Sequence, residues 1–291
     1  MKRKSFAAPF CVTDGKNFRL KKFDTHVTGG LPSKKDALEA SEAALSRLTE
    51  LQEKLYADDR WALLLIFQAM DAAGKDSTIK HVMSGVNPLG CQVFSFKAPS
   101  AEDLDHDFLW RTTKCLPERG RIGIFNRSYY EEVLVVRVHP EFLQAQKLPA
   151  VTADIWKERF EDIHAYERHL TRNGTVIRKF FLNVSRKEQE KRFLERLDRP
   201  EKNWKFSAAD LKERQHWNEY MSAYEDMIRH TATENAPWYV VPADTKWFTR
   251  LVVSEAINET LEGLDLRYPA VDAAKRKELK KIRSMLAGNG D

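Results

Sequence analysis

The chain has 291 residues, of which 42% are hydrophobic and 31% charged, so it can form one large or two small folded domains and is too apolar to be disordered. The net charge of +5 is mild, and local clusters of charge carry more information than the total. Three scattered cysteines argue against a disulfide framework or a zinc site, and no apolar run approaches the ~18 residues of a membrane span. Because the start also lacks a secretory signal, we expect a soluble, cytoplasmic protein.

The predicted elements begin with an arm, residues 1–32, that either wraps the domain or stays partly mobile, and leucines at helical spacing then predict a helix over 34–58. Apolar runs predict strands at 61–67, 91–96, 121–126, 175–182 and 237–241. Helical stretches are predicted at 75–86, 101–114, 151–172, 185–198, 207–232 and 245–264. This alternation indicates an α/β fold with a mainly parallel sheet covered on both faces, in which ligands bind at the carboxyl ends of strands. Residues 270–284 are rich in lysine and arginine and most simply form a solvated terminal helix.

Residues 71–78, Asp-Ala-Ala-Gly-Lys-Asp-Ser-Thr, follow the first buried strand and precede an amphipathic stretch. Strand–loop–helix units of this kind bind phosphate through backbone N–H groups, the helix dipole and a lysine, here Lys75. The strict motif is not met, because Ala69 replaces a glycine and Asp76 replaces the serine or threonine after the lysine. The alternative is an ordinary turn that needs Gly74 only for its backbone freedom.

Asp71 lies inside this loop, among groups that attract anions. A carboxylate there needs compensation, most simply from a metal ion or from Lys75. One interpretation is a ligand for Mg²⁺, with Mn²⁺ as a possible substitute, or a group that positions the acceptor phosphate. The other is a turn aspartate that accepts backbone N–H bonds, and the sequence does not decide between them.

A second strand–loop unit, residues 121–132, places Asn126 and Arg127 at a strand end. In a parallel sheet this end lies on the same edge as the phosphate loop. Many nucleotide-binding loops carry a magnesium-binding aspartate there, and an asparagine can still orient water or phosphate without charge. For Arg127 the alternative is a salt bridge to Glu131 or Glu132 on the next turn.

Residues 178–205 concentrate basic side chains, and Arg192 lies on a helix whose arginines recur at spacings of three and four. One interpretation is a lid, residues 185–215, that closes a basic face over a polyanion and excludes water. Interleaved acidic residues favour the alternative of a solvated, charged helix.

Five segments in order resemble the second family of polyphosphate kinases over about residues 30–265. They are Ala69-Met-Asp-Ala-Ala-Gly-Lys-Asp76, Ser84-Gly-Val-Asn-Pro88, Ser95-Phe-Lys-Ala-Pro99, Asn126-Arg-Ser-Tyr-Tyr130 and Lys202-Asn-Trp-Lys-Phe-Ser207. The resemblance implies a P-loop kinase-like three-layer sandwich with a helical lid. It also implies a magnesium-dependent, reversible transfer between inorganic polyphosphate and nucleotides. The sequence after Asn126 looks like the subgroup that accepts both nucleoside mono- and diphosphates.

The resemblance implies functional roles for Asp71, Lys75, Arg127, Lys179 and Arg192, of which we expect the first three to be catalytic. We also expect phosphate or polyphosphate contacts from Ala73, Gly74, Asp76, Ser77, Arg178, Lys179, Arg192 and Lys205. Nucleotide contacts are expected from Lys97, Asn126, Tyr130 and Glu132.

On this basis residues 33–265 form the kinase domain and residues 266–291 a C-terminal tail or helix. Expected partners are inorganic polyphosphate, AMP, ADP and possibly guanine nucleotides, with no nucleic acid or membrane and with assembly into a homodimer or homotetramer. Two alternative functions stay open: an ATP-dependent nucleoside or nucleotide kinase of the same fold, and a polyanion-binding protein without catalysis.

Overall fold

The computed structural model of the protein describes residues 5–31 and 34–288. At its centre is a six-stranded sheet in the order β1-β6-β5-β2-β4-β3, in which only β1 runs antiparallel to its neighbour. The strands are β1 Cys11–Val12, β2 Ala62–Gln68, β3 Cys91–Ser95, β4 Ile122–Asn126, β5 Thr175–Asn183 and β6 Trp238–Pro242. The five predicted strands are present, each within one residue of its expected bounds, and the α/β fold class is confirmed. The short strand β1 was not predicted, because a two-residue strand carries no period.

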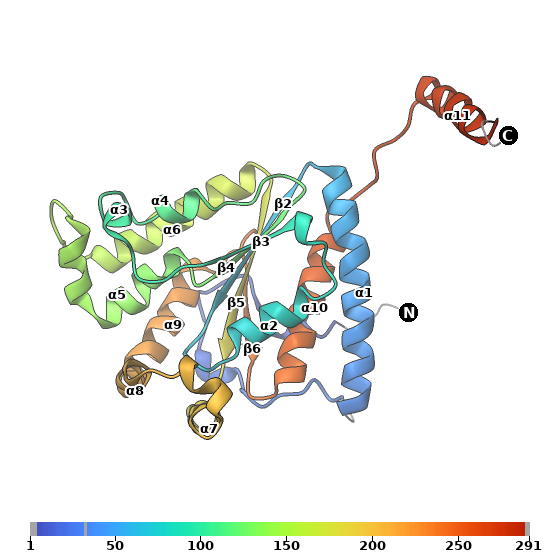
Figure 1. Cartoon of the computed structure of the whole chain (residues 1–291). Helices are drawn as coiled ribbons and strands as arrows, with labels where there is room; N and C mark the ends of the chain where they lie inside the picture. Colours follow the sequence, from blue (N-terminus) through green and yellow to red (C-terminus); the bar gives the residue numbers. More distant parts are fainter. Residues whose placement is uncertain (1–4, 32–33, 289–291) are drawn as a thin grey trace.

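Helices cover both faces of the sheet and form a three-layer sandwich (Figure 1). The α-helices are α1 Lys34–Asp58, α2 Lys75–Val82, α3 Ala101–Leu104, α4 Trp110–Thr113, α5 Val135–Val138, α6 Ile155–Arg172, α7 Arg186–Leu197, α8 Ala208–Gln215, α9 Trp217–Thr231, α10 Lys246–Glu262 and α11 Ala273–Gly288. Short 3-10 helices span Ala8–Phe10, Leu20–Lys22, Pro88–Gly90, Tyr129–Val133, Pro140–Gln146 and Pro200–Lys205. Helices α1, α2 and α10 pack together on one side, and α5, α6 and α9 on the other.

Two predicted helices are interrupted in the structure. The stretch 101–114 divides into α3 and α4, because the Asp107 carboxylate accepts the backbone N–H of Leu109 at 2.9 Å and stabilises a turn there. The stretch 207–232 divides at His216, whose backbone leaves the helical region with φ −85° and ψ 23°. The second break separates α8 from α9, so the segment 185–215 that was predicted as a lid contains a short helix of its own.

The N-terminal arm packs on the domain over its described part, residues 5–31. Phe10, Val12, Phe18 and Leu20 belong to the buried core, and β1 extends the sheet beyond β6. The C-terminal helix α11 differs, because it stands away from the body at the end of an extended linker (Figure 1) and has no buried residue.

The carboxyl ends of the parallel strands meet at one edge of the sheet. In the pairing register Phe67 faces Asn126, and Gln68 faces Phe181. The segments that follow β2, β4, β5 and β6 therefore converge at this edge, where doubly wound sheets bind their ligands.

Candidate active site

The phosphate loop joins β2 to α2 over residues 69–74. Gly74 adopts the left-handed region with φ 107°, which explains the glycine at this position, and Ala72 also has a positive φ of 60°. The loop directs the chain so that α2 begins at Lys75, with its first-turn N–H groups facing the loop. These N–H groups and the positive end of the helix dipole form a site for an anion.

The Lys75 side chain folds back across the loop. Its Nζ donates to the carbonyl oxygen of Ala69 at 2.7 Å, and the residue is only 9% exposed. Burial lowers the pKa of Lys75 from its ordinary value, although the nearby carboxylate of Asp71 acts in the opposite direction. The loop thus encloses a cation that a phosphate group could neutralise.

Arg127 directly follows β4 and adopts a left-handed backbone conformation with φ 65°. Its Nη2 donates to Asp71 Oδ1 at 3.3 Å, so the side chain turns toward the phosphate loop. Among the described residues the ion pair of Arg127 is with Asp71 and not with Glu131 or Glu132, although the charge of Glu131 also acts on the Arg127 side chain. The unusual backbone of Arg127 is therefore associated with bringing its charge to the loop.

A cavity of about 250 Å³ opens beside Asp71 and Arg127. Its wall also contains Glu131 and, from the lid and α9, four further residues: Asp210, Glu213, Tyr220 and Tyr224. Burial raises the pKa of Glu131, and the charges of Arg127 and Lys75 partly offset this effect. With the Gln68 amide turned so that both of its ends find partners, its nitrogen donates to Glu131 Oε1 at 2.9 Å. The cavity thus places the half-buried carboxyl group of Glu131 close to the Arg127 guanidinium at the sheet edge, with Lys75 near enough to act on it electrostatically.

Sequence reasoning missed Glu131 as a site residue and did not assign Asp210, Glu213, Tyr220 or Tyr224. Tyr220 and Tyr224 are four residues apart on α9, and this spacing was the available signal for a shared helix face. Asp210 forms a capping box with Ser207, a pattern that indicated only a structural role.

The Asn126 side chain links three elements at the same edge. Its Nδ2 donates to Asp76 Oδ1 at 2.9 Å and to Ser95 Oγ at 3.3 Å, while Ser77 Oγ donates to the Gly74 carbonyl at 3.0 Å. Asn126, Asp76 and Ser77 are therefore gathered around the phosphate loop, and the place of Asn126 at this edge agrees with the parallel topology.

Lys179 lies in the core and not in a substrate channel. Its side chain is 0% exposed and forms an ion pair of 2.6 Å with Glu167, and Nζ also donates to Tyr130 Oη and to the Thr231 carbonyl. Tyr130 is likewise fully buried and donates to Glu167. The predictions that Lys179 contacts polyphosphate and Tyr130 contacts nucleotide are wrong in this structure, because both side chains satisfy one another inside the sandwich.

Arg178 also points away from the site. Its Nε donates to Thr260 Oγ1 at 2.8 Å near the end of α10, and its Nη1 donates to the Ile177 carbonyl. Adjacent residues of a strand face opposite sides of the sheet, so Arg178 and Lys179 could not both face one channel. The predicted phosphate contact of Arg178 is corrected to a contact with α10.

Arg192 connects helix α7, which lies in the segment predicted as a lid, to the phosphate loop. Its Nη1 donates to the carbonyls of Ala72 and Ala73 at 3.1 and 2.7 Å, and its Nη2 donates to those of Ala243 and Asp244 at 2.7 and 3.2 Å. Nε donates to Glu188, and the residue is only 4% exposed. Because its donors are already engaged, the predicted direct contact of Arg192 with polyphosphate is corrected to a role in holding the loop.

Gln189 provides a second connection between α7 and the loop. Its Nε2 donates to the Asp71 carbonyl at 3.0 Å, and its Oε1 accepts from Arg214 of α8 at 2.7 Å. Carbonyls of three successive loop residues, Asp71, Ala72 and Ala73, thus accept bonds from side chains of α7, which fixes the backbone of the loop.

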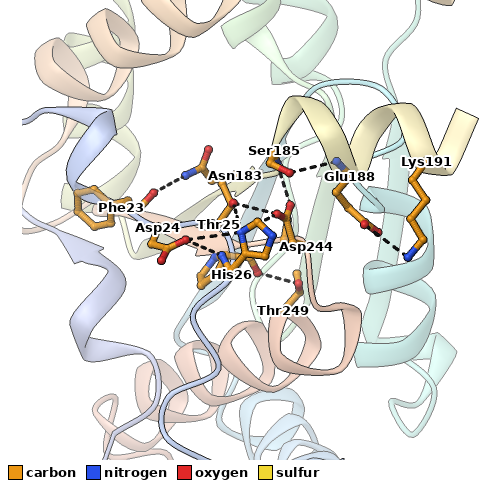
Figure 2. A network of polar contacts seen from close by, with 12 residues as sticks. Phe23, Asp24, Thr25, His26, Asn183, Ser185, Glu188, Lys191, Asp244 and Thr249 are labelled. Carbon is orange, nitrogen blue, oxygen red and sulfur yellow. Dashed lines mark hydrogen bonds and ion pairs between the residues drawn. The ribbon is translucent and has the colours of Figure 1, made fainter.

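The start of α7 is held by a polar network around the buried Asp244 (Figure 2). Its carboxylate accepts the N–H of Ser185 at 2.8 Å and the hydroxyl of Thr25 at 2.9 Å, and it pairs with His26 at 3.1 Å. Asn183 donates to the Phe23 carbonyl at 2.9 Å beside it. The N-terminal arm therefore reaches the start of α7, at the base of the segment predicted as a lid.

A smaller cavity, about 80 Å³, contains Glu132. Gln146 donates to Glu132 Oε2 at 2.6 Å, and Arg159 donates in turn to Gln146 at 2.7 Å. Arg111, another wall residue, donates to the carbonyl of the exposed Lys97 at 2.8 Å. Glu132 and Lys97 thus flank one region, while the side chain of Lys205 lies outside what the structure describes.

The donor atoms near Asp71 suit a hard cation. Carboxylate groups of Asp71, Glu131 and Asp210 line the larger cavity, and Asp71 is partly exposed there. In the described ranges no group of three acidic, histidine or cysteine side chains could hold a metal by itself. Mg²⁺ typically uses one or two carboxylates and completes its coordination with phosphate oxygens and water, so this donor set fits such an ion.

The comparisons with known proteins agree on one family. The family model described as polyphosphate kinase 2 matches residues 32–268. The chain is 56% identical over 280 residues to the ADP-polyphosphate phosphotransferase of Rhodopseudomonas palustris, covering 95% of this chain and 97% of that protein. It is 46% identical over 265 residues to the AMP/ADP-polyphosphate phosphotransferase of Meiothermus ruber, covering 91% and 96%.

A solved structure gives the same result at the level of the fold. The crystal structure of polyphosphate kinase 2 from Arthrobacter aurescens TC1 superposes with a TM-score of 0.87 at 42% identity, covering 96% of this chain and 97% of that chain. Within residues 5–31 and 34–288, no helix has the length and apolar character that a membrane crossing requires.

Proposed function

The chain belongs to the polyphosphate kinase 2 family, and we propose that it transfers phosphoryl groups between inorganic polyphosphate and adenine nucleotides, converting AMP to ADP and ADP to ATP reversibly. One observation carries the proposal: Lys75 and Arg127 converge on the loop that leads into the first turn of α2, at the carboxyl edge of the sheet. Phosphoryl transfer needs alignment and neutralised charge more than covalent chemistry, and this edge supplies both.

The phosphate loop would hold the terminal phosphates of the polymer through its N–H groups, with Lys75 exchanging its bond to Ala69 for a phosphate oxygen. Arg127 would neutralise charge that develops on the transferred group, and Asp71 keeps its guanidinium pointed at the loop. The acceptor is the terminal phosphate of AMP or ADP, whose oxygens are largely ionised near neutral pH, so no general base is required.

We propose Mg²⁺ as the metal, with Mn²⁺ as a substitute, and Asp71 as its protein ligand. The support is the oxygen-only donor set of the cavity and the family membership. When bound, the ion would neutralise phosphate oxygens and hold them in place. Asp71 would hold the ion through its carboxylate, and the positive charge of the ion would compensate that carboxylate.

We place the nucleotide near Glu132 and Lys97, in and beside the smaller cavity. Asn126, at the neighbouring strand end, would orient the acceptor phosphate. A carboxylate and several polar groups in a shallow cavity can bond to a ribose or to either purine, so guanine nucleotides belong to the proposed range.

We also propose cytoplasmic placement, since Cys11, Cys91 and Cys115 are free thiols, as a reducing compartment favours.

Assembly into a homodimer or homotetramer is proposed as well. The edge strand β3 exposes Val93, and Leu89 before it is 75% exposed, which gives an apolar surface for a second copy. Light scattering of the purified protein tests the assembly.

The deciding experiment incubates the purified protein with Mg²⁺ and either AMP or ADP, offering polyphosphate in one set and ATP or GTP without polyphosphate in the other. Polyphosphate-dependent formation of ADP and ATP is the expected result. Transfer only from a nucleoside triphosphate would assign the chain to ATP-dependent kinases. Polyphosphate binding without turnover would leave a polyanion-binding protein.

A further inference from the structure

Helix α11 holds the net positive charge of the protein. Its basic residues are Lys275, Arg276, Lys277, Lys280, Lys281 and Arg283, and its one acidic residue is Glu278. This excess of five equals the net charge of the whole chain, so the remaining residues balance. A field of one sign is therefore concentrated on a single 16-residue element.

The lysines of this helix are available to a ligand. Lys277, Lys280 and Lys281 are exposed, and their spacing places them on one side of the helix. Lys275 pairs with Glu278 at 2.9 Å, whereas the described part of the chain shows no carboxylate paired with Lys277, Lys280 or Lys281. Like charges this close repel one another, and a polyanion relieves that repulsion.

The body of the protein offers fewer such cations than its sequence suggested. Lys179 and Arg192 are buried and bonded to protein groups, and Arg178 is bonded to α10. A polymeric substrate extends well beyond the few phosphates that the loop after β2 can hold. The family model ends at residue 268, so α11 lies outside the region that the match covers.

We propose that α11 is a docking site for inorganic polyphosphate, separate from the site of phosphoryl transfer. The proposal rests on the proposed function only for the identity of the polyanion. Figure 1 places α11 on a linker near the sheet end where β2 begins, opposite the phosphate loop. A long polymer could therefore occupy both sites, and the second contact would raise its effective concentration at the first, whereas a short polymer occupies only one.

The test compares two variants of equal charge change. One carries Lys277→Gln, Lys280→Gln and Lys281→Gln, and the matched control carries Lys16→Gln, Lys21→Gln and Lys22→Gln, which are exposed lysines of the N-terminal arm. Polyphosphate affinity is measured across a salt series by binding titration, and KM is measured in parallel, with long-chain polyphosphate and with tripolyphosphate.

For the α11 variant we expect long-chain affinity to fall about tenfold, because the second point of attachment is lost. The slope of log affinity against log salt should fall by about 2, if each lost contact counts about 0.7 as in single-stranded nucleic acids. Tripolyphosphate affinity and kcat should not change, and the control should resemble wild type. An unchanged long-chain affinity, or an equal loss in the control, would overturn the proposal.

A third variant, Leu279→Gln with Ile282→Gln, keeps the charge and alters the apolar side of α11, where both residues are exposed. Loss of long-chain affinity in this variant together with dissociation of subunits would assign α11 to subunit contact and reject the docking site. Wild type that binds long chains through α11 but transfers no phosphate would contradict the proposed function and leave this proposal supported.

Discussion

At the scale of single residues, Lys75 is the group on which the site depends most directly. Its Nζ already forms a 2.7 Å bond to the Ala69 carbonyl, so the ammonium is placed within the loop before any substrate contact. We expect Lys75→Ala to lower kcat/KM for polyphosphate by ~10²–10³-fold, the usual cost of removing one donor to a charged transition state. Steady-state kinetics with circular dichroism as the folding control test this. Near-normal kcat/KM in a folded variant would remove the phosphate-loop assignment.

The pH dependence of the free enzyme should also report on Lys75. Burial lowers its pKa, with a smaller contribution from Arg127 in the same direction, so the charge is lost at a lower pH than for a lysine in water. We therefore expect kcat/KM for polyphosphate to fall on the alkaline side below the ordinary lysine range, since neutral Lys75 cannot bind phosphate. A Lys75→Arg variant, which keeps its charge, should lose this alkaline decline even if its rate is lower. If kcat/KM of the Lys75→Arg variant still falls at the same alkaline pH, the decline is caused by the titration of another group.

Asp71 has two explanations that one substitution separates. The carboxylate bonds Arg127 at 3.3 Å and lines the cavity where a metal would lie. If it holds Mg²⁺, Asp71→Asn should lower the rate and raise the magnesium concentration needed for half-maximal activity, because an amide is a weaker ligand. If it only positions Arg127, the rate should fall with an unchanged magnesium requirement. A magnesium titration of both proteins decides.

The residue scale also shows where sequence reasoning stopped. Gly74 and Lys75 were identified because strand, loop and helix occur in one continuous segment. Lys179 was misassigned because its partner Glu167 lies on α6, and no local pattern connects them. A lysine inside a strand that is apolar on both faces needs a buried partner for its charge. That rule could have indicated that Lys179 is buried and does not contact the substrate.

At the scale of elements, α7 stabilises the phosphate loop through hydrogen bonds from its side chains to the loop carbonyls. Arg192→Ala would leave four backbone carbonyls without their donor and would remove the 2.9 Å bond from Nε to Glu188, whose other ion pair, with Lys191, is longer at 3.8 Å. We expect a loss of about 3 kcal/mol in unfolding free energy, as for breaking a buried charged network. Lys191→Ala is the matched control, because that side chain is 66% exposed on the same helix and should change stability by less than about 1 kcal/mol.

Chemical denaturation of both variants measures the difference. The same experiment distinguishes the two roles considered for Arg192, holding the loop or binding polyphosphate. Replacing a side chain whose main partner is polyphosphate would change KM and leave the free energy of unfolding unchanged. Equal stability of the Arg192→Ala and Lys191→Ala proteins would therefore contradict the contacts that the structure assigns to Arg192.

Element types were predictable because strand and helix periods differ and each strand is a short apolar run. The seven residues of β2 are all buried, as a central parallel strand requires. The breaks within 101–114 and 207–232 were not predictable from period, since they depend on single residues such as Asp107 and His216. The spacing of basic residues in α7 predicted that the segment is helical. It did not predict what those residues contact, because a basic helix face can be exposed to solvent, bind a substrate or pack against backbone carbonyls.

At the scale of the whole molecule, the two chain ends have opposite relations to the core. The N-terminal arm contributes Phe10 and Phe18 to the core and Thr25 to the network at Asp244, so it supports both the sheet and the lid base. Helix α11 contributes no buried residue. Composition alone could not distinguish these cases, since both ends are rich in charge and neither has a strong period.

Two truncations test this asymmetry. Removing residues 269–291 should leave the midpoint of thermal unfolding unchanged, because no core contact is lost.

Removing residues 1–31 should lower the free energy of unfolding by more than about 4 kcal/mol, since deletion of one buried aromatic side chain alone typically costs 3–5 kcal/mol. If the protein without residues 1–31 does not fold, the Thr25→Val variant measures the contribution of one contact of the arm to the free energy of unfolding. It removes the hydroxyl that Asp244 accepts at 2.9 Å and should cost about 1–3 kcal/mol by leaving a buried carboxylate short of a donor. A stable protein without its first 31 residues would show that the arm only covers the core and does not hold the lid base.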